Sequence, residues 1–397
     1  MFISKILSPY SILVGLAAYW AYPAINHAIQ LGGWYQESEF QPLNVEECKV
    51  IQGMDGCEMI HIHKPWGVAI LACADMERRK TWWPPIHRMT PPKDTSTPVH
   101  DPLFIYNLRS GKVKPLIIKG LDTEFVSHGF SIYPNSEDSL TLALINHAYT
   151  GSRVEFLDLE RGSDQAVWRK TVGPNPELMP FPNSVVLTSP DSFYVTNDHA
   201  YTDGWKRTLE DLLFPAVTTV VSYDGIHNTM AIAADELKYA NGIAMSPDGQ
   251  YIYVLETAGL DVITYLRDPV HPERLHETGR IPLGTVLDNV AVDPDTGDLY
   301  VTQIPQPYVW MAHIQDPKGV HSPIRVSRIQ NATHAYGAGQ VRRPNHPPLP
   351  VITKMVEDDG SRISGITIGT GDKATNRWFI AGPIMEGVRV CPFPIVD

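Results

Sequence analysis

The sequence has few basic residues for its length. Its 397 residues include 32 Lys and Arg against 44 Asp and Glu, which gives a formal net charge of −12 at pH 7. Binding to nucleic acid requires a basic surface that neutralises phosphates. We therefore expect no nucleic-acid partner. The 43% of hydrophobic residues and 19% of charged residues are typical of a folded chain rather than a disordered one.

Three widespread catalytic motifs are also missing from the sequence. It contains no Gly-x-Ser-x-Gly nucleophile elbow, no His-Glu-x-x-His zinc helix and no phosphate-binding glycine loop. These absences argue against a serine nucleophile on an α/β-hydrolase fold, against a zinc-protease site and against a P-loop nucleotide site.

The chain has only four cysteines. Cys48 precedes the first strand-like repeat and Cys391 follows the last predicted strand, so a bond between them would join the two ends of the folded body. Cys57 and Cys73 flank a Lys-Pro-Trp-Gly turn almost symmetrically. They either pair across a hairpin or remain as two buried thiols, and the sequence leaves both possibilities open.

The first thirty residues differ from the rest of the chain. Lys5 is the only charged residue among the first 36, and residues 6–24 are mostly apolar. Residues 1–30 are thus a cleaved signal peptide or a retained membrane-anchor helix. Trp20 and Tyr22 form an interfacial aromatic pair that favours the anchor. A buried N-terminal helix is the remaining alternative.

A signal or an anchor would both direct the body of the protein into the secretory pathway. The body would be secreted, or held on the lumenal or extracellular side of a membrane. In that compartment the sequon Asn331-Ala332-Thr333 becomes a candidate for glycosylation.

One phrase of strand, turn and strand recurs along the chain. In residues 241–254, Ile243 and Met245 alternate with small residues, Ser-Pro-Asp-Gly marks a turn, and β character resumes at Tyr251. Related phrases begin at Glu58, His128, Asn183, Asp288 and Ser364, which makes six copies with that of Asn241.

Repeats spaced by about 50 to 75 residues, with several short strands each, are typical of a β-propeller. The sequence therefore predicts an all-β fold, a six-bladed propeller over residues 45–397. Residues 103–107 and 262–266 are suitable outer strands, whereas residues 76–102 and 318–350 are expected to form loops. A two-sheet sandwich would not explain six equivalent phrases.

A short helix is predicted after the third repeat, where it would lie on one rim of the ring. Trp205, Leu209, Leu212 and Leu213 recur at helical spacing, and charged residues occupy the opposite face. The apolar stripe either packs on the propeller or forms a wall or membrane-facing lid of the active site.

A polar residue opens every copy of the repeat. In a propeller these residues would lie in one ring around one end of the central channel, and carboxylates and amides predominate among them: Glu58, His128, Asn183, Asn241, Asp288 with Asn289, and Ser364. Such hard oxygen ligands suit Ca²⁺ better than Zn²⁺. The His61-x-His63 pair shares one face of a strand, which we expect to be solvated.

At this point the chain resembles the serum paraoxonase/arylesterase family of six-bladed propeller hydrolases. The resemblance covers most of residues 45–393, and its most specific stretches are Ser127-His128-Gly129-Phe130, Ile145-Asn146-His147, residues 193–199, Ala240-Asn241-Gly242-Ile243 and Leu287-Asp288-Asn289-Val290. It implies a catalytic calcium at the bottom of the active-site cavity, held by Glu58, Asn183, Asn241, Asp288 and Asn289. It also implies a histidine dyad of His128 and His147, a Cys48–Cys391 disulfide and a retained N-terminal helix.

The sequence departs from this family at a second, structural calcium. The family uses an aspartate directly after the first ligand and another after the asparagine of the third repeat, where this chain has Met59 and Ser184. Neither side chain can supply a carboxylate. We therefore expect the second ion to be absent or weakly bound.

The expected activity is calcium-dependent hydrolysis of a small-molecule lactone or aryl ester. Calcium would polarise the carbonyl and His128 would activate water with help from His147, although Asp288 is an alternative base. Two other functions stay open. The same cavity could isomerise, cyclise or ring-open a specialised metabolite, or the metal could hold together a non-catalytic binding propeller.

Overall fold

The computed structural model describes residues 22, 25–33, 40–334 and 348–395. Residues 25–31 are helical, and the rest of the predicted N-terminal signal or anchor lies outside the described residues. Among the described residues no helix is both long and apolar enough to cross a membrane.

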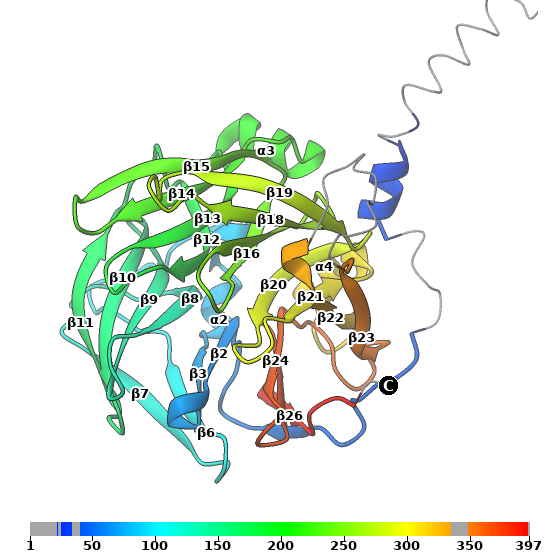
Figure 1. Cartoon of the computed structure of the whole chain (residues 1–397), viewed down its shortest axis with the longest axis horizontal. Helices are drawn as coiled ribbons and strands as arrows, with labels where there is room; N and C mark the ends of the chain where they lie inside the picture. The colour runs from blue at the N-terminus through cyan, green and yellow to red at the C-terminus, as the bar shows by residue number, and fades with distance from the viewer. Residues whose placement is uncertain (1–21, 23–24, 34–39, 335–347, 396–397) are drawn as a thin grey trace, which may run out of the picture.

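The body consists of antiparallel four-strand meanders that follow one another along the chain (Figure 1). The first two share one eight-stranded sheet, because β7 and β11 pair in parallel. Its strands are β2 (Met59–His63), β3 (Val68–Ala72), β6 (Leu103–Asn107), β7 (Val113–Lys119), β8 (Ser127–Pro134), β9 (Ser139–Ala148), β10 (Gly151–Glu160) and β11 (Gln165–Val172).

Three separate four-stranded sheets come next. They contain β12 (Phe181–Leu187), β13 (Phe193–His199), β14 (Thr218–Asp224) and β15 (Thr229–Leu237); β16 (Ala240–Met245), β17 (Tyr251–Glu256), β18 (Asp261–Arg267) and β19 (Leu275–Pro282); β20 (Val286–Val292), β21 (Leu299–Ile304), β22 (Ile324–Gln330) and β23 (Val351–Asp358). The expected outer strands at 103–107 and 262–266 are thus confirmed as β6 and most of β18.

The last sheet joins the two ends of the body. β24 (Ile368–Asp372), β25 (Arg377–Ala381) and β26 (Val388–Cys391) are completed by β1 (Lys49–Ile51) from the start of the chain. The Cys48–Cys391 disulfide lies beside this pairing, as predicted. Cys57 and Cys73 also form a disulfide, which settles the choice that the sequence left open.

The first strand of each meander lies in the interior of the molecule. β2, β8, β12, β16, β20 and β24 pack in that order, and β24 packs back against β2, so the six strands form a closed ring. Apolar side chains of neighbouring sheets fill the space between them, for example Val186 and Tyr194 of one sheet with Ile243 and Val254 of the next. The sheets therefore share a continuous core around this ring.

Short elements cover one end of the ring. Residues 76–102, expected to be an irregular loop, contain α2 (Met76–Arg79), η2 (Pro84–Ile86) and a small hairpin of β4 (Trp82–Trp83) and β5 (Arg88–Met89). α3 (Gly204–Leu213) confirms the predicted rim helix, whereas α4 (Pro307–Gln315) was not predicted. Two further 3-10 turns are η1 (Lys64–Trp66) and η3 (Ala332–His334).

The structure decides between the two positions left open for the apolar stripe of α3 and overturns the expectation for His61. The apolar stripe of α3 does not pack on the sheets, since Trp205 and Leu213 are each 70% exposed while Arg207 is fully buried. His61 is not on a solvated face either. Its Nε2 lies 2.6 Å from the carbonyl oxygen of Phe130 and its ring meets the Phe130 ring edge-on.

Candidate functional site

The polar residues of the ring sit at irregularities in the inner strands. The regular pairing register breaks between residues 127 and 130 in β8, 182 and 185 in β12, 240 and 243 in β16, and 287 and 290 in β20. These breaks contain His128, Asn183, Asn241, Asp288 and Asn289. A bulge re-aims a side chain that would otherwise follow the alternation of the strand.

Two glycines allow the inner strands to approach one another at this level. A Cβ at Gly129 would lie 2.5 Å from the carbonyl oxygen of Asn183, and one at Gly242 would lie 2.7 Å from that of Asp288. A side chain at either position would push the strands apart. The two Gly positions therefore set the narrow diameter of the ring beside the candidate ligands.

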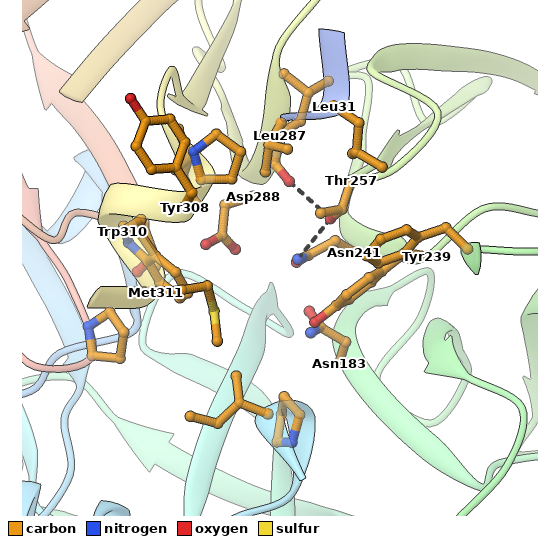
Figure 2. A pocket seen from close by; sticks show the side chains of 18 of the residues that line it. Leu31, Asn183, Tyr239, Asn241, Thr257, Leu287, Asp288, Tyr308, Trp310 and Met311 are labelled. Carbon is orange, nitrogen blue, oxygen red and sulfur yellow. Dashed lines mark hydrogen bonds between the residues drawn. The ribbon is translucent and has the colours of Figure 1, made fainter. Parts of the chain in front are cut away.

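Neighbouring groups hold the amides of the ring in fixed orientations. Asn183 Nδ2 donates to Asp198 Oδ2 (3.0 Å), and Asn241 Nδ2 donates to Thr257 Oγ1 (3.1 Å), which in turn donates to the Leu287 carbonyl (2.8 Å). Figure 2 shows Asn183, Asn241 and Asp288 around one central space. With the amide nitrogens so engaged, the amide oxygens are left for a cation.

Two buried oxygens of the ring lack a hydrogen-bond partner among the described residues. Glu58 Oε2 and Asn241 Oδ1 are buried and make no hydrogen bond, although Arg79 Nη1 lies 3.6 Å from that Glu58 oxygen. Asn289 Nδ2 donates to both Glu58 Oε1 (3.3 Å) and Asp288 Oδ1 (3.2 Å), so the two carboxylates are close neighbours. Unpaired buried oxygens of this kind require a cation or another explanation.

The electrostatics of Glu58 and Asp288 also favour a bound cation. Burial raises the pKa of Glu58, and Arg79 only partly opposes this. Burial, followed by the charge of Glu58, raises the pKa of Asp288 well above its ordinary value. Arg79 offers one positive charge against these two carboxylates, so a bound divalent cation would neutralise what remains.

The ligand chemistry favours a hard cation. The described residues contain no cluster of three or more His, Cys, Asp or Glu suited to a metal. What the ring offers is two carboxylates and three amides: Glu58, Asp288, Asn183, Asn241 and Asn289, all at most 8% exposed. Oxygen donors in this number fit Ca²⁺, whereas Zn²⁺ prefers imidazole and thiolate.

The two predicted histidines lie next to each other beside this ring. The ring centroids of His128 and His147 are 5.0 Å apart. His147 Nδ1 is 2.8 Å from Ser152 Oγ, and His128 Nδ1 makes no hydrogen bond to the described part of the chain. Burial lowers the pKa of His147 to about 4, and burial together with His147 and Arg79 holds the pKa of His128 well below its ordinary value. Both imidazoles are therefore neutral at pH 7 and able to accept a proton.

The ring forms the floor of a cavity of about 460 Å³. Glu58, His128, Asn183, Asn241 and Asp288 line it, whereas His147 and Asn289 lie behind the surface. The upper walls are apolar and aromatic, with Tyr308, Trp310 and Met311 of α4 on one side in Figure 2. The site thus combines a polar floor with apolar walls.

One predicted member of the ring is misplaced. Ser364 lies outside the cavity, where its hydroxyl contacts Ser322. Thr367, directly before β24, lines the cavity in its place, and its hydroxyl donates to the Glu58 carbonyl (3.2 Å). The sixth copy of the repeat was therefore read three residues too early.

Other residues of the site were missed altogether. Arg79 is 2% exposed and reaches the Glu58 carboxylate from α2, inside a stretch predicted to be loop. Tyr239 directs its hydroxyl toward Asn183 in Figure 2 and has a backbone φ of 59°. Thr257 follows the second strand of the best repeat, so its position in that repeat is the one signal that could have revealed it.

The fold and the candidate site together define a class of protein: a ring of β-meanders whose buried carboxylates and amides lie, with a histidine pair, at the floor of a cavity with apolar walls. The chain belongs to the arylesterase family, whose model matches residues 39–387. The resemblance seen in the sequence is thus confirmed.

Curated relatives agree with this assignment. The chain is 27% identical over 359 residues to serum paraoxonase/arylesterase 2 of Rattus norvegicus, with 89% of this chain and 90% of the relative covered. It is 29% identical over 268 residues to serum paraoxonase/arylesterase 1 of Homo sapiens, with 66% and 70% covered. The family and these relatives support hydrolysis of esters or lactones in general.

Similar solved structures include a luciferin-regenerating enzyme (TM-score 0.48, 11% identity, 90% of this chain and 98% of that chain). Another is the calcium-binding protein regucalcin from Agrobacterium tumefaciens (TM-score 0.46, 12% identity, 89% and 94%). At these values the likeness carries no information on the activity of this chain.

Proposed function

We propose that this protein is a six-bladed β-propeller that hydrolyses lactones or aryl esters with one bound Ca²⁺. The observation that carries the proposal is the buried floor of the cavity, where two carboxylates and oriented amides converge with unpaired oxygens, next to a pair of neutral histidines. Glu58, Asn183, Asn241, Asp288 and Asn289 would hold the ion. A binding protein with a purely structural ion would need no such histidine pair.

The residues have separate roles in this scheme. A bound Ca²⁺ supplies polarisation of the substrate carbonyl and stabilisation of the developing oxyanion. His128 lines the cavity and takes the proton from the attacking water, because its imidazole is neutral. His147, behind it, orients His128 or accepts the proton in turn. Asp288 remains the alternative base, since it also lines the cavity and has a raised pKa.

A substrate panel tests the activity. The purified protein is assayed on lactones, aryl esters and phosphotriesters, with Ca²⁺ and with a chelator. We expect turnover of a lactone or aryl ester that the chelator abolishes and Ca²⁺ restores. An absence of calcium-dependent turnover on every substrate would contradict the proposal and favour the isomerase or binding alternatives.

His128→Gln separates the base from the metal site. We expect turnover to fall by about 10²–10⁴-fold, the usual contribution of a general base, while Ca²⁺ still raises the melting temperature. Full activity of this variant would remove His128 from the mechanism, and Asp288 would become the leading candidate for the base.

We propose a single ion rather than two. Met59 lies in an apolar cluster, and Ser184 offers a hydroxyl and no carboxylate. The backbone carbonyl oxygen of Phe130, in the neighbouring strand β8, contacts His61 Nε2 and is therefore not left over as a ligand for a second ion. Equilibrium titration with Ca²⁺ should therefore give one tight site per chain, and two tight sites would refute this point.

We also propose that the cavity mouth lies against a membrane and that the protein enters the secretory pathway. Leu212 of α3 lines the cavity and is 68% exposed, and the residues that follow the apolar N-terminal run line the same cavity.

Asn331 is exposed, which is compatible with glycosylation. Flotation of the full chain with phospholipid vesicles tests the membrane contact; a full chain that stays at the bottom of the gradient would contradict it.

A further inference from the structure

The described N-terminal segment, residues 25–33, forms one wall of the cavity. Residues 25–31 are helical, and Ala28, Leu31 and Gly32 line the cavity together with the candidate ligands. Leu31 packs in the apolar cluster of Leu260, Val286 and Ile304, which Trp310 also joins. The segment is therefore part of the cavity rather than an appendage beside it.

Gly33 fixes the position of this wall. It is buried, with a φ of 72°, and a Cβ there would lie 2.5 Å from the Pro305 carbonyl oxygen and 3.1 Å from Pro307 Cδ. Its amide donates to Gln30 O (2.9 Å), which ends the helix in the manner of a C-terminal glycine cap. Only glycine allows the helix end to lie this close to the start of α4.

The wall faces the region above the proposed calcium ligands. In Figure 2 Leu31 lies above Leu287 and Thr257. Ala28, Leu31 and Gly32 present no charged or hydrogen-bonding side chain to the cavity, and the facing residues of α4 include Trp310 and Met311. A ligand group between these two walls gains contacts only if it is apolar.

We propose that residues 28–33 and α4 enclose a subsite for the apolar chain or ring of the substrate, so that the N-terminal segment determines substrate specificity. The assignment to a substrate rests on the proposed hydrolase function. The segment then selects by the length and bulk of the apolar group, whereas the floor of the cavity acts on the carbonyl.

Leu31→Ala tests the subsite directly. Ile25→Ala is the matched control, because Ile25 lies on the same helix, is 55% exposed and does not line the cavity. For a lactone with a decyl chain against one with a methyl group, we expect Leu31→Ala to lower the ratio of kcat/KM values about tenfold, through KM. Ile25→Ala should leave the ratio within twofold. An unchanged ratio in Leu31→Ala would overturn the proposal.

Gly33→Ala tests whether the position of the segment matters. Gly162→Ala is its control, since Gly162 has a φ of 81° and a Cβ added there would meet nothing within 4 Å, so that it carries the same backbone strain without the clash. We expect Gly33→Ala to lose chain-length selectivity while the melting temperatures of the two variants stay within a few degrees of each other. Full selectivity in a folded Gly33→Ala variant would overturn the proposal.

A binding measurement separates this proposal from the proposed activity. The probes are two lactams that cannot be hydrolysed under the assay conditions, one with a decyl and one with a methyl substituent. Their binding is measured by calorimetry. Tighter binding of the decyl lactam that Leu31→Ala weakens supports the subsite, even if no ester is turned over. Equal binding of both lactams to the unmodified protein overturns the subsite, whatever the turnover.

Discussion

Replacing Asp288 by Asn should stabilise the protein without calcium and lose most of that advantage when calcium is present. Asp288 is 8% exposed, and its carboxylate has no cationic partner among the described residues. Asn289 Nδ2 lies 3.3 Å from Glu58 Oε1 and 3.2 Å from Asp288 Oδ1, so these two carboxylates are roughly 6 Å apart. At an effective dielectric constant of about 20, their repulsion is about 3 kcal/mol. The isosteric amide removes it.

In chelator at pH 8, Asp288→Asn should therefore melt several degrees above the unmodified protein. The sign with pH follows from the raised pKa of Asp288. The folded state binds this proton more tightly than the unfolded state. The destabilisation of the folded protein by a charged Asp288 is therefore absent below about pH 4, the ordinary pKa of aspartate, and grows as the pH rises through the pKa of Asp288 in the folded state. The advantage of the variant should shrink steadily as the pH falls from 8 toward 4.

With Ca²⁺ most of this advantage should disappear. An ion at 100 times its dissociation constant stabilises the unmodified protein by about 2.7 kcal/mol, and a variant that has lost one charged ligand gains less at the same concentration. Differential scanning fluorimetry in chelator and in CaCl₂ measures both effects, with exposed Asp122→Asn as the control. The reasoning fails if Asp288→Asn is less stable than the unmodified protein in chelator, or if its calcium-induced shift is unchanged.

Three further predictions concern other parts of the molecule. Replacing both Cys48 and Cys391 by Ala should lower the free energy of unfolding by about 5 kcal/mol, against about 3 kcal/mol for the Cys57–Cys73 pair, because the closed loops span 343 and 16 residues; denaturant titration that ranks the pairs the other way would contradict this. Burial and Glu256 raise the pKa of Asp261 to about 7, so the folded state holds this proton until about pH 7 and Asp261→Asn should raise the melting temperature at pH 8 more than at pH 5; an equal rise at both would be inconsistent with the shift. Thr257→Val frees the Asn241 amide and should weaken Ca²⁺ binding about tenfold in a calorimetric titration, and an unaltered affinity would exclude this orienting role.

The parts of the fold and site that could be predicted from the sequence are those for which several copies of the repeat carry the same signal. The phrase around Asn241 recurs with Asn183 and Asp288 at matching places, and a rotation about one axis brings matching places together. The copies that failed are the degenerate ones. Near Ser364 the phrase lacks a Pro-Asp turn like those at 247–248 and 294–295, and the polar residue that lines the cavity is Thr367, three residues later.

The remaining parts depend on tertiary contacts that leave no local pattern. A bulge at Asn241 does not interrupt the alternation of Ile243 and Met245, so the sequence cannot distinguish it from regular pairing. α4 has no clear apolar stripe in its sequence, and its position depends instead on its contacts around the cavity. Arg79 becomes a partner of Glu58 only because α2 folds over the end of the ring.

The reversed orientation of α3 shows how packing overrides an amphipathic pattern. Arg207 is fully buried, donates to the Pro85 carbonyl (3.1 Å) and lies over the Phe181 ring. Glu210 accepts hydrogen bonds from the amides of Ala200 (2.7 Å) and Tyr201 (3.1 Å). These bonds satisfy backbone groups that an apolar face could not serve. The polar face therefore faces the body of the protein.

This orientation has a consequence for the proposed reaction. With its polar face held down, α3 presents Leu212 at the cavity, opposite a floor of carboxylates and amides. A substrate that entered with its apolar part first would place that part against the polar floor, where it makes fewer apolar contacts. Its carbonyl would then stay at the mouth, without the hydrogen bonds and the proposed cation of the floor. Under the proposed function, an ester or lactone would therefore bind with its carbonyl toward Asp288 and His128 and its apolar group toward α3, α4 and Leu31. The packing that inverts the helix would then also set the orientation of the proposed substrate.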